Sequence, residues 1–353
     1  MTTGNPLRAA IIGTGAIAKS HLAAYEAHPS EVTVVAAADV DEARVAGFST
    51  GDIKPYTEIE RLLAEEKPDI VSLCTPPALH VGQAVRSLTA GAWVWCEKPP
   101  CLSLSEYDEI TAAESEGGPY AGFVFQHRFG SAAGHFRELL AAGGLGRPLV
   151  AHCQTTWFRD AEYYAVPWRG DWATEGGGPA MGQGIHQIDL LLHLLGDWAE
   201  IRAMTGRLVH DVRTDDVSTA LARFESGALA TVVNSVLSPD EVSRIRIDCS
   251  GATVELTHLY GYDNDDWTCT PAPHGDKEWR PPEANIPSSH TAQLTHVLAA
   301  IRAGERPPCS GADGRRALEF IAALYKSAFT GRTVHAGEIT SEDPFHFAMN
   351  GES

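Results

Sequence analysis

The sequence of 353 residues lacks a basic excess: 27 Lys and Arg stand against 46 Asp and Glu, giving a net charge of -19. Nucleic acids and anionic membrane surfaces select basic patches, so this composition argues against both as partners. A dinucleotide cofactor is still allowed, because binding it requires only a local dipole and a few hydrogen-bond donors.

Paired cysteines and long apolar runs are also missing. The seven cysteines are odd in number and include no Cys-x-x-Cys pair, which predicts reduced and mostly buried thiols. No run of about 18 apolar residues occurs, and the first residues show no signal-peptide pattern. We therefore expect a cytoplasmic protein without a membrane span.

What is present is a regular alternation of strands and helices over the first 125 residues. We expect strands at 7–12, 32–38, 69–74, 93–96 and 120–125, and helices at 15–28, 52–67, 80–90 and 105–116. Such alternation predicts an α/β fold with a parallel sheet and helices on both faces. We assign residues 1–125 to this first domain.

The remaining residues, 126–353, predict a second α/β domain with a large, open, mostly antiparallel sheet. Its terminal helices are able to pack back on the first domain. We expect strands at 149–157, 200–209, 216–224, 228–237, 243–249 and 252–256, helices at 134–142, 181–195, 290–303 and 312–329, and a surface loop at 263–289. If helices cover one face of this sheet, a second subunit is needed for the other, so we expect a homodimer or homotetramer.

A glycine-rich turn follows the first strand. Gly13 permits a tight turn, Gly15 lets the backbone approach a pyrophosphate, and Ala18 keeps the following helix close to the strand. Asp39 ends the second strand, where a carboxylate accepts hydrogen bonds from ribose hydroxyls and repels a 2′-phosphate. The pattern predicts a dinucleotide-binding Rossmann domain that favours NAD over NADP, a preference that Arg44 would soften.

Lys98 lies just after the carboxyl end of the strand 93–96, and parallel sheets bind ligands at the carboxyl ends of their strands. A second motif, the glycine run 176–178 followed by Gly184-Ile185-His186, lies downstream. A nicotinamide, a cation and a histidine are the parts needed to move a hydride to or from a hydroxylated carbon.

With these residues in view, the chain resembles the glucose–fructose oxidoreductase / inositol dehydrogenase / rhizopine-catabolism family of nicotinamide oxidoreductases. The likeness spans nearly the whole chain. Its motifs are Gly13-x-Gly15-x-x-Ala18, Asp39, Cys74-Thr75-Pro76-Pro77-x-x-His80, Glu97-Lys98-Pro99, His127-Arg128-Phe129, Gly184-Ile185-His186-x-x-Asp189 and Arg223-Phe224-Glu225-Ser226-Gly227-Ala228.

The resemblance implies sugars, polyols or their derivatives as substrates, and an open sheet used for oligomerisation. It implies Lys98 as the group that binds the hydroxyl and stabilises the alkoxide, and His186 as general acid and base. The cofactor-binding residues it implies are Gly13, Gly15, Ala16, Ile17, Asp39, Thr75, Pro76, His80, Glu97 and Lys98. Substrate contacts are expected from Arg128, Trp157, Arg159, Trp168 and Asp189, because aromatic faces interspersed with cations suit a sugar-sized polyol.

The chain departs from the family at two points. Many relatives carry an aspartate four residues before the histidine, where this chain has Gly182. Either the substrate differs, or Asp171 or Glu175 substitutes, or the chain is not a dehydrogenase. Many relatives also carry an asparagine where this chain has Pro77, which removes a side-chain hydrogen bond at that turn.

Other readings stay open. His186, Asp189 and His193 share one helix face, but neither Cys nor a carboxylate cluster joins them, and we expect no metal. An NADP-dependent reductase is the nearest alternative. More distant ones are an enzyme that retains NAD while cleaving glycosidic bonds, and a non-catalytic NAD-binding regulator, since the galactose-pathway repressor resembles this family.

Overall fold

The computed structural model describes residues 5–273 and 282–352, which divide into two compact units. Over the described residues, the first unit comprises Met1–Cys101, Glu106–Val124 and His290–Arg315. The second comprises Leu102–Ser105, Phe125–Ser289 and Arg316–Ser353.

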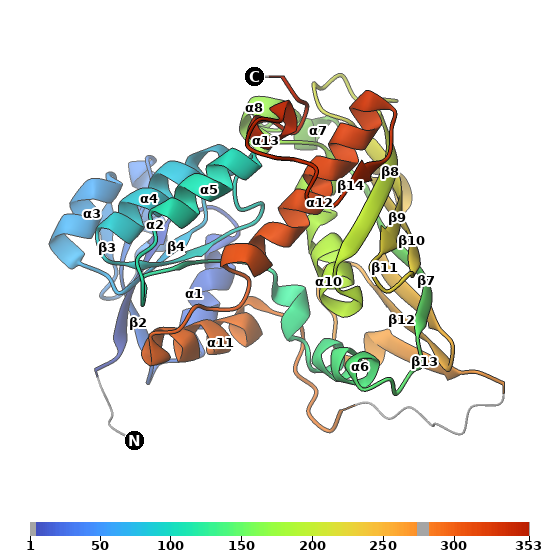
Figure 1. Ribbon diagram of the computed structural model, residues 1–353. Helices are drawn as coiled ribbons and strands as arrows, with labels where there is room; N and C mark the ends of the chain where they lie inside the picture. The colour runs from blue at the N-terminus through green and yellow to red at the C-terminus, as the bar shows by residue number, and fades with distance from the viewer. Residues whose placement is uncertain (1–4, 274–281, 353) are drawn as a thin grey trace. The chain divides into compact units, whose positions relative to one another are not determined.

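The first unit is built on a six-stranded parallel sheet with the order β3-β2-β1-β4-β5-β6 (Figure 1). The order reverses between β1 and β4, so their carboxyl ends flank the crevice where doubly wound sheets bind ligands. This confirms the predicted Rossmann-like fold. The strands are β1 (Leu7–Ile12), β2 (Val32–Ala38), β3 (Lys54–Tyr56), β4 (Ile70–Leu73), β5 (Trp93–Cys96) and β6 (Ala121–Phe123).

The helix predicted at 52–67 is wrong in its first half, because residues 54–56 form β3. Pro55 explains the error: it lacks an N–H, and it disfavours the helical conformation at Lys54. A short helix that begins after Asp41 was missed, although the Asp41 carboxylate caps it by accepting from the Arg44 amide at 3.0 Å. The helices are α1 (Ala18–Glu26), α2 (Glu42–Phe48), α3 (Ile59–Glu66), η1 (Pro77–Leu79), α4 (His80–Thr89), α5 (Leu104–Ala112) and α11 (His290–Ala303).

Helix α11 joins the first unit from far along the sequence. Its Leu294, Val297 and Leu298 are buried in one core with Ile11 and Tyr25. The core of the dinucleotide-type sheet therefore depends on residues almost 300 positions from the glycine-rich turn.

The second unit holds an eight-stranded sheet with the order β13-β12-β11-β7-β10-β9-β8-β14. Its neighbours pair antiparallel except for β7 and β10, so the expected mostly antiparallel sheet is confirmed with one parallel pair. The strands are β7 (Pro148–Phe158), β8 (Trp198–Gly206), β9 (Val217–Phe224), β10 (Leu229–Ser235), β11 (Leu237–Cys249), β12 (Ala252–His258), β13 (Trp267–Pro271) and β14 (Val334–His335).

The loop predicted at 263–289 contains β13, because Trp267 is buried beside the Tyr262 and Phe136 rings; residues 274–281 of that prediction lie outside the described residues. The predicted helix 181–195 is two helices, because the Gly184 amide bonds back to the Pro179 carbonyl at 2.7 Å. The helices are η2 (Gln126–Phe129), α6 (Ser131–Ala141), α7 (Ala161–Tyr164), α8 (Trp172–Glu175), α9 (Pro179–Gly182), α10 (Ile185–Leu195), η3 (Asn264–Asp266), α12 (Gly311–Thr330) and α13 (Pro344–Phe347).

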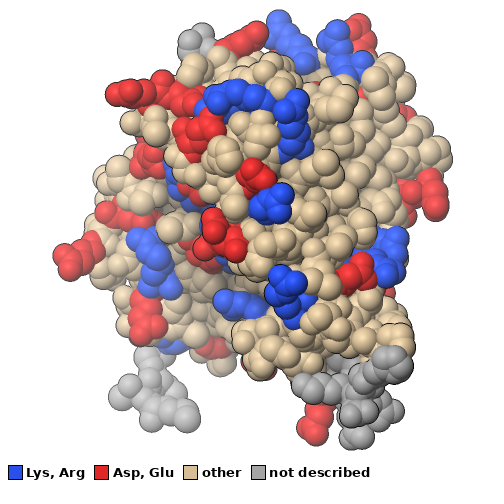
Figure 2. Space-filling view, turned by 45° about the vertical axis from the view of Figure 1, so that its right-hand side comes forward, with Lys and Arg blue, Asp and Glu red and all other residues tan. Residues whose placement is uncertain are grey.

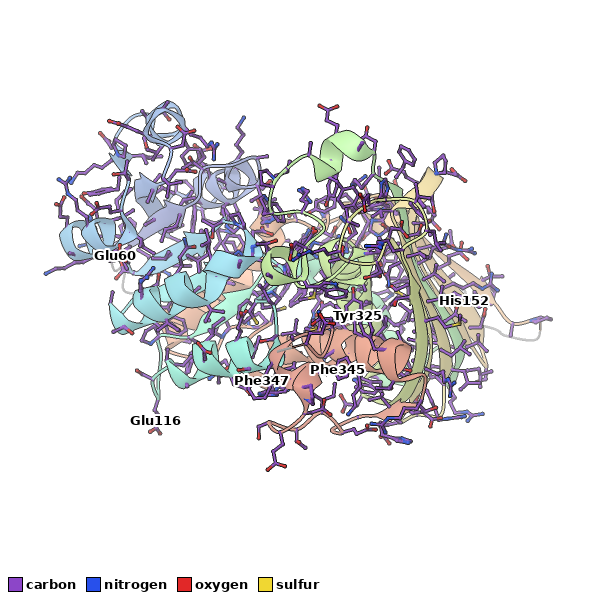
Figure 3. All side chains as sticks on the ribbon, turned by 90° about the horizontal axis from the view of Figure 1, so that it is seen from above. Glu60, Glu116, His152, Tyr325, Phe345 and Phe347 are labelled. Carbon is purple, nitrogen blue, oxygen red and sulfur yellow. The ribbon has the colours of Figure 1, made fainter. Side chains whose placement is uncertain are left out.

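One face of the second sheet is covered and the other is open. Ile188, Leu190 and Leu191 of α10 are fully buried, as expected for a helix enclosed on all sides. On the opposite face, His152 of β7 lies 2.8 Å from the Thr231 hydroxyl of β10 and is exposed (Figure 3).

Charges of both signs lie interspersed over the face of the molecule in Figure 2. Ion pairs also join neighbouring strands of the second sheet, such as Arg244 with Glu255 at 2.7 Å and Arg223 with Glu200 at 2.8 Å. Exposed pairs of this kind add little stability.

Candidate active site

The glycine-rich turn joins β1 to α1 and requires glycine at its first position. Gly13 has φ +85°, and a Cβ there would lie 2.8 Å from the Cys74 carbonyl carbon and oxygen. At Gly15 a Cβ would meet no described atom within 4 Å, which leaves room against the backbone. Ala16 and Ile17 complete the turn, and Ile17 is the residue before the first helical one.

Asp39 lies at the carboxyl end of β2, and its carboxylate holds this turn in place through hydrogen bonds. Its Oδ2 accepts from the Thr14 amide at 2.8 Å and the Thr14 hydroxyl at 3.0 Å, and its Oδ1 accepts from the Asp41 amide. Although partial burial opposes ionisation, these hydrogen bonds hold the pKa of Asp39 below its usual range. The Arg44 guanidinium lies 3.6 Å from Oδ1 and is about half exposed.

The segment after β4 is fixed by hydrogen bonds within the first unit. The Thr75 hydroxyl donates to Gln83 at 2.6 Å, and Pro76 precedes η1, which begins at Pro77. His80 is buried, with Nε2 at 2.8 Å from the Thr75 carbonyl and Nδ1 at 2.9 Å from the Pro99 carbonyl. His80 thus ties the end of β4 to the segment that follows Lys98.

Glu97 anchors the half-buried Lys98. Its Oε1 lies 2.9 Å from His21 Nε2 and 2.8 Å from His290 Nε2, while Oε2 lies 3.3 Å from the Lys98 amide. Burial opposes ionisation of Glu97, but the two imidazoles hold its pKa well below the usual range. A buried carboxylate therefore fixes the backbone that carries the lysine.

His21, Glu97 and His290 are also the group of metal-ligating side chains that converges among the described residues, with ligand atoms within 4.8 Å of one another. Their nitrogen–oxygen separations are those of hydrogen bonds. Ligands about 2.1 Å from a tetrahedral metal would lie farther apart, at about 3.4 Å. We therefore interpret this group as a hydrogen-bonded carboxylate.

The histidine that the sequence predicts as general acid and base lies in the second unit. His186, in the first turn of α10, is buried, with its ring centroid 4.9 Å from that of His127 and 5.9 Å from that of Tyr260. His258 lies 5.2 Å from His127, and burial lowers the pKa of His258 to about 4. His186 therefore belongs to a cluster of imidazoles and tyrosines.

Arg128 and Asp189, both expected to contact substrate, pair with each other. Both are buried, and the Arg128 guanidinium donates to both Asp189 oxygens, from Nε at 2.6 Å and also from Nη2. The pair joins η2, which carries His127, to α10, which carries His186.

The aromatic loop that follows β7 forms a stack of rings and cations. The Arg159 guanidinium lies 4.9 Å from the Trp157 ring, and the Arg169 guanidinium lies 4.3 Å from the Trp168 ring. Tyr163 lies between the two arginines, at 5.3 Å and 3.8 Å. The loop therefore presents flat rings backed by cations, which suits a hydroxylated ligand.

The two carboxylates considered as substitutes at Gly182 have different surroundings. Asp171 caps α8 by accepting from the Ala173 amide and lies 3.3 Å from Arg213. Glu175 is buried, and a Cβ on Gly182 would lie 3.4 Å from its Oε1. The structure thus brings Glu175, and not Asp171, to the turn before His186.

Residues 7–121 match the family described as "Oxidoreductase family, NAD-binding Rossmann fold", and residues 134–255 match the "GFO/IDH/MocA C-terminal domain". The chain belongs to the GFO/IDH/MocA oxidoreductase family. It is an NAD-binding oxidoreductase of a family whose relatives act on sugars and polyols, and the open space at Gly15 fits such a cofactor.

Two curated relatives illustrate the likeness. The chain is 26% identical to D-glucoside 3-dehydrogenase of Escherichia coli (strain K12), covering 94% of this chain and 98% of that one. It is 25% identical to myo-inositol 2-dehydrogenase of Thermotoga maritima, covering 94% and 99%. Among solved structures, the WlbA dehydrogenase from Bordetella pertussis in complex with NADH and UDP-GlcNAcA matches with a TM-score of 0.83 at 25% identity, covering 94% and 99%.

Sequence reasoning missed several site residues. His21 and His290 lie 76 and 193 positions from Glu97, and His258 and Tyr260 lie more than 70 from His186, so no local pattern links them.

None of the described helices is long and apolar enough to cross a membrane.

Proposed function

We propose that this enzyme oxidises a secondary hydroxyl of a sugar, polyol or glycoside, using NAD as hydride acceptor. The observation that carries the proposal is Lys98, held at the carboxyl end of β5 by a buried carboxylate in a sheet with a dinucleotide turn. A fixed cation at that edge suits a substrate oxygen that becomes an alkoxide.

Bound NAD supplies the electrophilic carbon that takes the hydride. Lys98 binds the substrate hydroxyl and stabilises negative charge on its oxygen as the proton leaves. His186 accepts that proton, because imidazole exchanges protons near neutral pH. The surrounding rings of His127 and Tyr260 limit the access of water to His186.

The substrate we propose is uncharged. Arg159 lies 3.0 Å from Glu241, and Arg169 lies 3.6 Å from Glu175, so both cations of the aromatic loop are compensated. The Trp157 and Trp168 rings then provide apolar faces for a sugar ring. Arg128 and Asp189 pair with each other and so neutralise each other's charge beside the two elements that carry His127 and His186.

The cofactor preference we propose is NAD over NADP. The Asp39 carboxylate stands where the adenosine ribose of such cofactors lies, and its low pKa keeps it anionic at neutral pH. Arg44 nearby leaves weak NADP use as the expected second activity.

We also propose that two or more copies associate through the open face of the second sheet. Met204 and Leu221 are 74% and 63% exposed there, and Leu229 is about half exposed. Light scattering of the wild type should give a dimer or tetramer, and Leu221→Lys should reduce the mass. A wild-type monomer would contradict this.

We also propose a cytoplasmic location. Cys74, Cys96 and Cys153 are free thiols rather than disulfides, as is usual in a reducing compartment.

The test of the activity is the absorbance of reduced nicotinamide for the wild type and Lys98→Met, with NAD and then NADP, over a panel of sugars, polyols and sugar acids. We expect reduction by the wild type with an uncharged member of the panel, and none by the variant. Cofactor that binds without net reduction would instead favour an NAD-retaining glycosidase or a regulator.

A further inference from the structure

Two histidines from distant parts of the chain meet at Glu97. His21 lies on α1 and His290 begins α11, and their Nε2 atoms lie 2.9 Å and 2.8 Å from Glu97 Oε1. All three side chains are buried. The other carboxylate oxygen, Oε2, lies 3.3 Å from the Lys98 amide. One oxygen thus receives both imidazoles, while the other holds the backbone of the lysine.

The hydrogen positions in this network follow from its partners. An ionised carboxylate only accepts hydrogen bonds, so both Nε2 atoms carry a hydrogen and donate to Glu97. His21 Nδ1 lies 3.0 Å from the Ser72 hydroxyl, which in turn lies 2.8 Å from the Tyr25 hydroxyl. Burial lowers the pKa of His21 and raises that of Tyr25, so the imidazole is neutral and the phenol keeps its proton. The hydrogen bonds therefore all point in one direction, from the Tyr25 phenol toward the Glu97 carboxylate.

The network packs against the strand that leads to Lys98. The His21 ring centroid lies 4.4 Å from that of Trp95, a fully buried residue of β5, and 5.0 Å from that of His290. The rings of Tyr25 and His290 lie 6.0 Å and 5.9 Å from Trp95. The two imidazoles are therefore fixed in position relative to Glu97 by the packing of their rings.

The charge on Glu97 depends on these two imidazoles. Burial alone favours the neutral acid, but the hydrogen bonds from His21 and His290 hold the pKa of Glu97 well below its usual range. The other ionisable groups that act on Glu97 or adjoin it are Cys74, Cys96, His80 and Lys98. Burial raises the pKa of both thiols and lowers that of His80, so these three groups are neutral at neutral pH and do not replace the imidazoles.

We propose that His290 is a positioning residue for the oxidation: with His21 it holds Glu97 as an anion, and this anion holds Lys98 in place and favours its ammonium form. The inference rests on the proposed function. A nearby negative charge stabilises the charged form of a lysine, and a cation is what a developing alkoxide requires. His290 therefore acts through Glu97 rather than on the substrate.

The experiment compares His290→Phe with the wild type, using the full-length enzyme and a panel substrate that the wild type oxidises. Phenylalanine fills the space without donating a hydrogen bond, so the pKa of Glu97 should rise into the range between about pH 6 and about pH 9. We expect kcat/KM to fall about tenfold relative to the wild type at the acid end of this range, where Glu97 is then protonated. The ratio should approach one at the alkaline end, where Glu97 is ionised again.

Two further variants separate positioning from packing. His290→Gln keeps an N–H donor, so it should recover most of the activity that His290→Phe loses at low pH. His28→Phe is the matched control, because His28 follows α1 and bonds to Thr295 of α11 at 2.9 Å, so it joins the same two helices away from Glu97. Its activity should equal that of the wild type throughout the pH range, and unchanged melting temperatures show that each variant is folded.

The charge on Glu97 can also be measured without substrate or cofactor. NMR of enzyme labelled at the glutamate carboxyl carbons follows each carboxyl group with pH, and the Glu97 signal is the one missing from Glu97→Gln. In the wild type this signal should stay that of an ionised carboxylate above about pH 5, whereas in His290→Phe it should titrate between about pH 6 and about pH 9.

The outcomes separate the two proposals. If the wild type reduces NAD but His290→Phe loses the same factor at every pH, loses nothing, or leaves the Glu97 titration unchanged, His290 has no positioning role and the dehydrogenase proposal stands. If the folded wild type binds NAD and oxidises nothing on the panel, the proposed function fails, and a role of His290 in oxidation fails with it.

Discussion

The buried carboxylate of Asp215 provides a pH test of the packing around the glycine run before α9. Its Oδ1 accepts from the Tyr325 hydroxyl at 2.9 Å and from the Gly178 amide at 3.1 Å, which pins the glycine run before α9. Tyr325 projects from α12, whose Phe329 ring lies beside that of Phe345 (Figure 3). Burial raises the pKa of Asp215 to about 7.

The direction in which stability changes with pH depends on how many protons the folded and unfolded states bind. The unfolded chain releases this proton near pH 3.8, whereas the folded protein keeps it until about pH 7. Between these values the folded state binds more protons, so the contribution of Asp215 to stability falls as pH rises and levels off above pH 7. From pH 5 to pH 8 the loss amounts to about 3 kcal/mol.

Asp215→Asn removes the charge and keeps the carbonyl acceptor. Relative to the wild type, the variant should therefore gain about 3 kcal/mol in free energy of unfolding between pH 5 and pH 8. Urea denaturation followed by fluorescence at both pH values measures this difference, with the exposed Glu342→Gln as control for charge removal. A difference between wild type and Asp215→Asn that stays constant from pH 5 to pH 8 would refute the reasoning.

Two further predictions concern the glycine turn and the buried ion pair. Gly13→Ala should cost at least about 1–2 kcal/mol of stability, because φ is +85° and the added Cβ meets the Cys74 backbone. Gly15→Ala should leave the melting temperature unchanged but weaken NAD binding, as measured by calorimetry. An equal decrease of the melting temperature in Gly13→Ala and Gly15→Ala would contradict this prediction. Asp189→Ala should lose about 3–5 kcal/mol in chemical denaturation, because the buried Arg128 loses the carboxylate that neutralises it, whereas Arg128→Met/Asp189→Leu should lose much less. A double variant as unstable as the single one would show that the charge pair is not the cause.

The sequence predicts the first unit well because its signals are local. Val32–Ala38 is a nearly continuous apolar strand, and the turn from Gly13 to Ala18 opens a helix directly after a strand. The prediction at 52–67 is wrong at its start because Pro55 favours the extended conformation of β3. In the second unit, residue 184 must be glycine because a Cβ there would clash with the Asn234 amide oxygen of β10, a contact that no local sequence pattern reveals.

The site is less predictable because its residues meet only in the folded chain. Lys98 and His186 belong to sequence motifs from which they can be predicted. The two imidazoles that contact Glu97, those of His21 and His290, come from α1 and α11, which lie far apart in the sequence. The sequence marked Gly182 as a departure and left Asp171 and Glu175 as equal substitutes. Only the packing of the loop before α9 separates them, since Asp171 is used as a helix cap.

The fate of the hydride tests the central claim most directly. The wild type is incubated with NAD and a panel substrate that carries deuterium on every carbon, and the nicotinamide and the sugar are analysed by mass spectrometry. The account predicts one deuterium on the reduced nicotinamide for each substrate oxidised to a carbonyl, and no transfer with Lys98→Met. A sugar product that regains its hydrogen while the cofactor ends oxidised, or bound NAD that never gains deuterium, would contradict it.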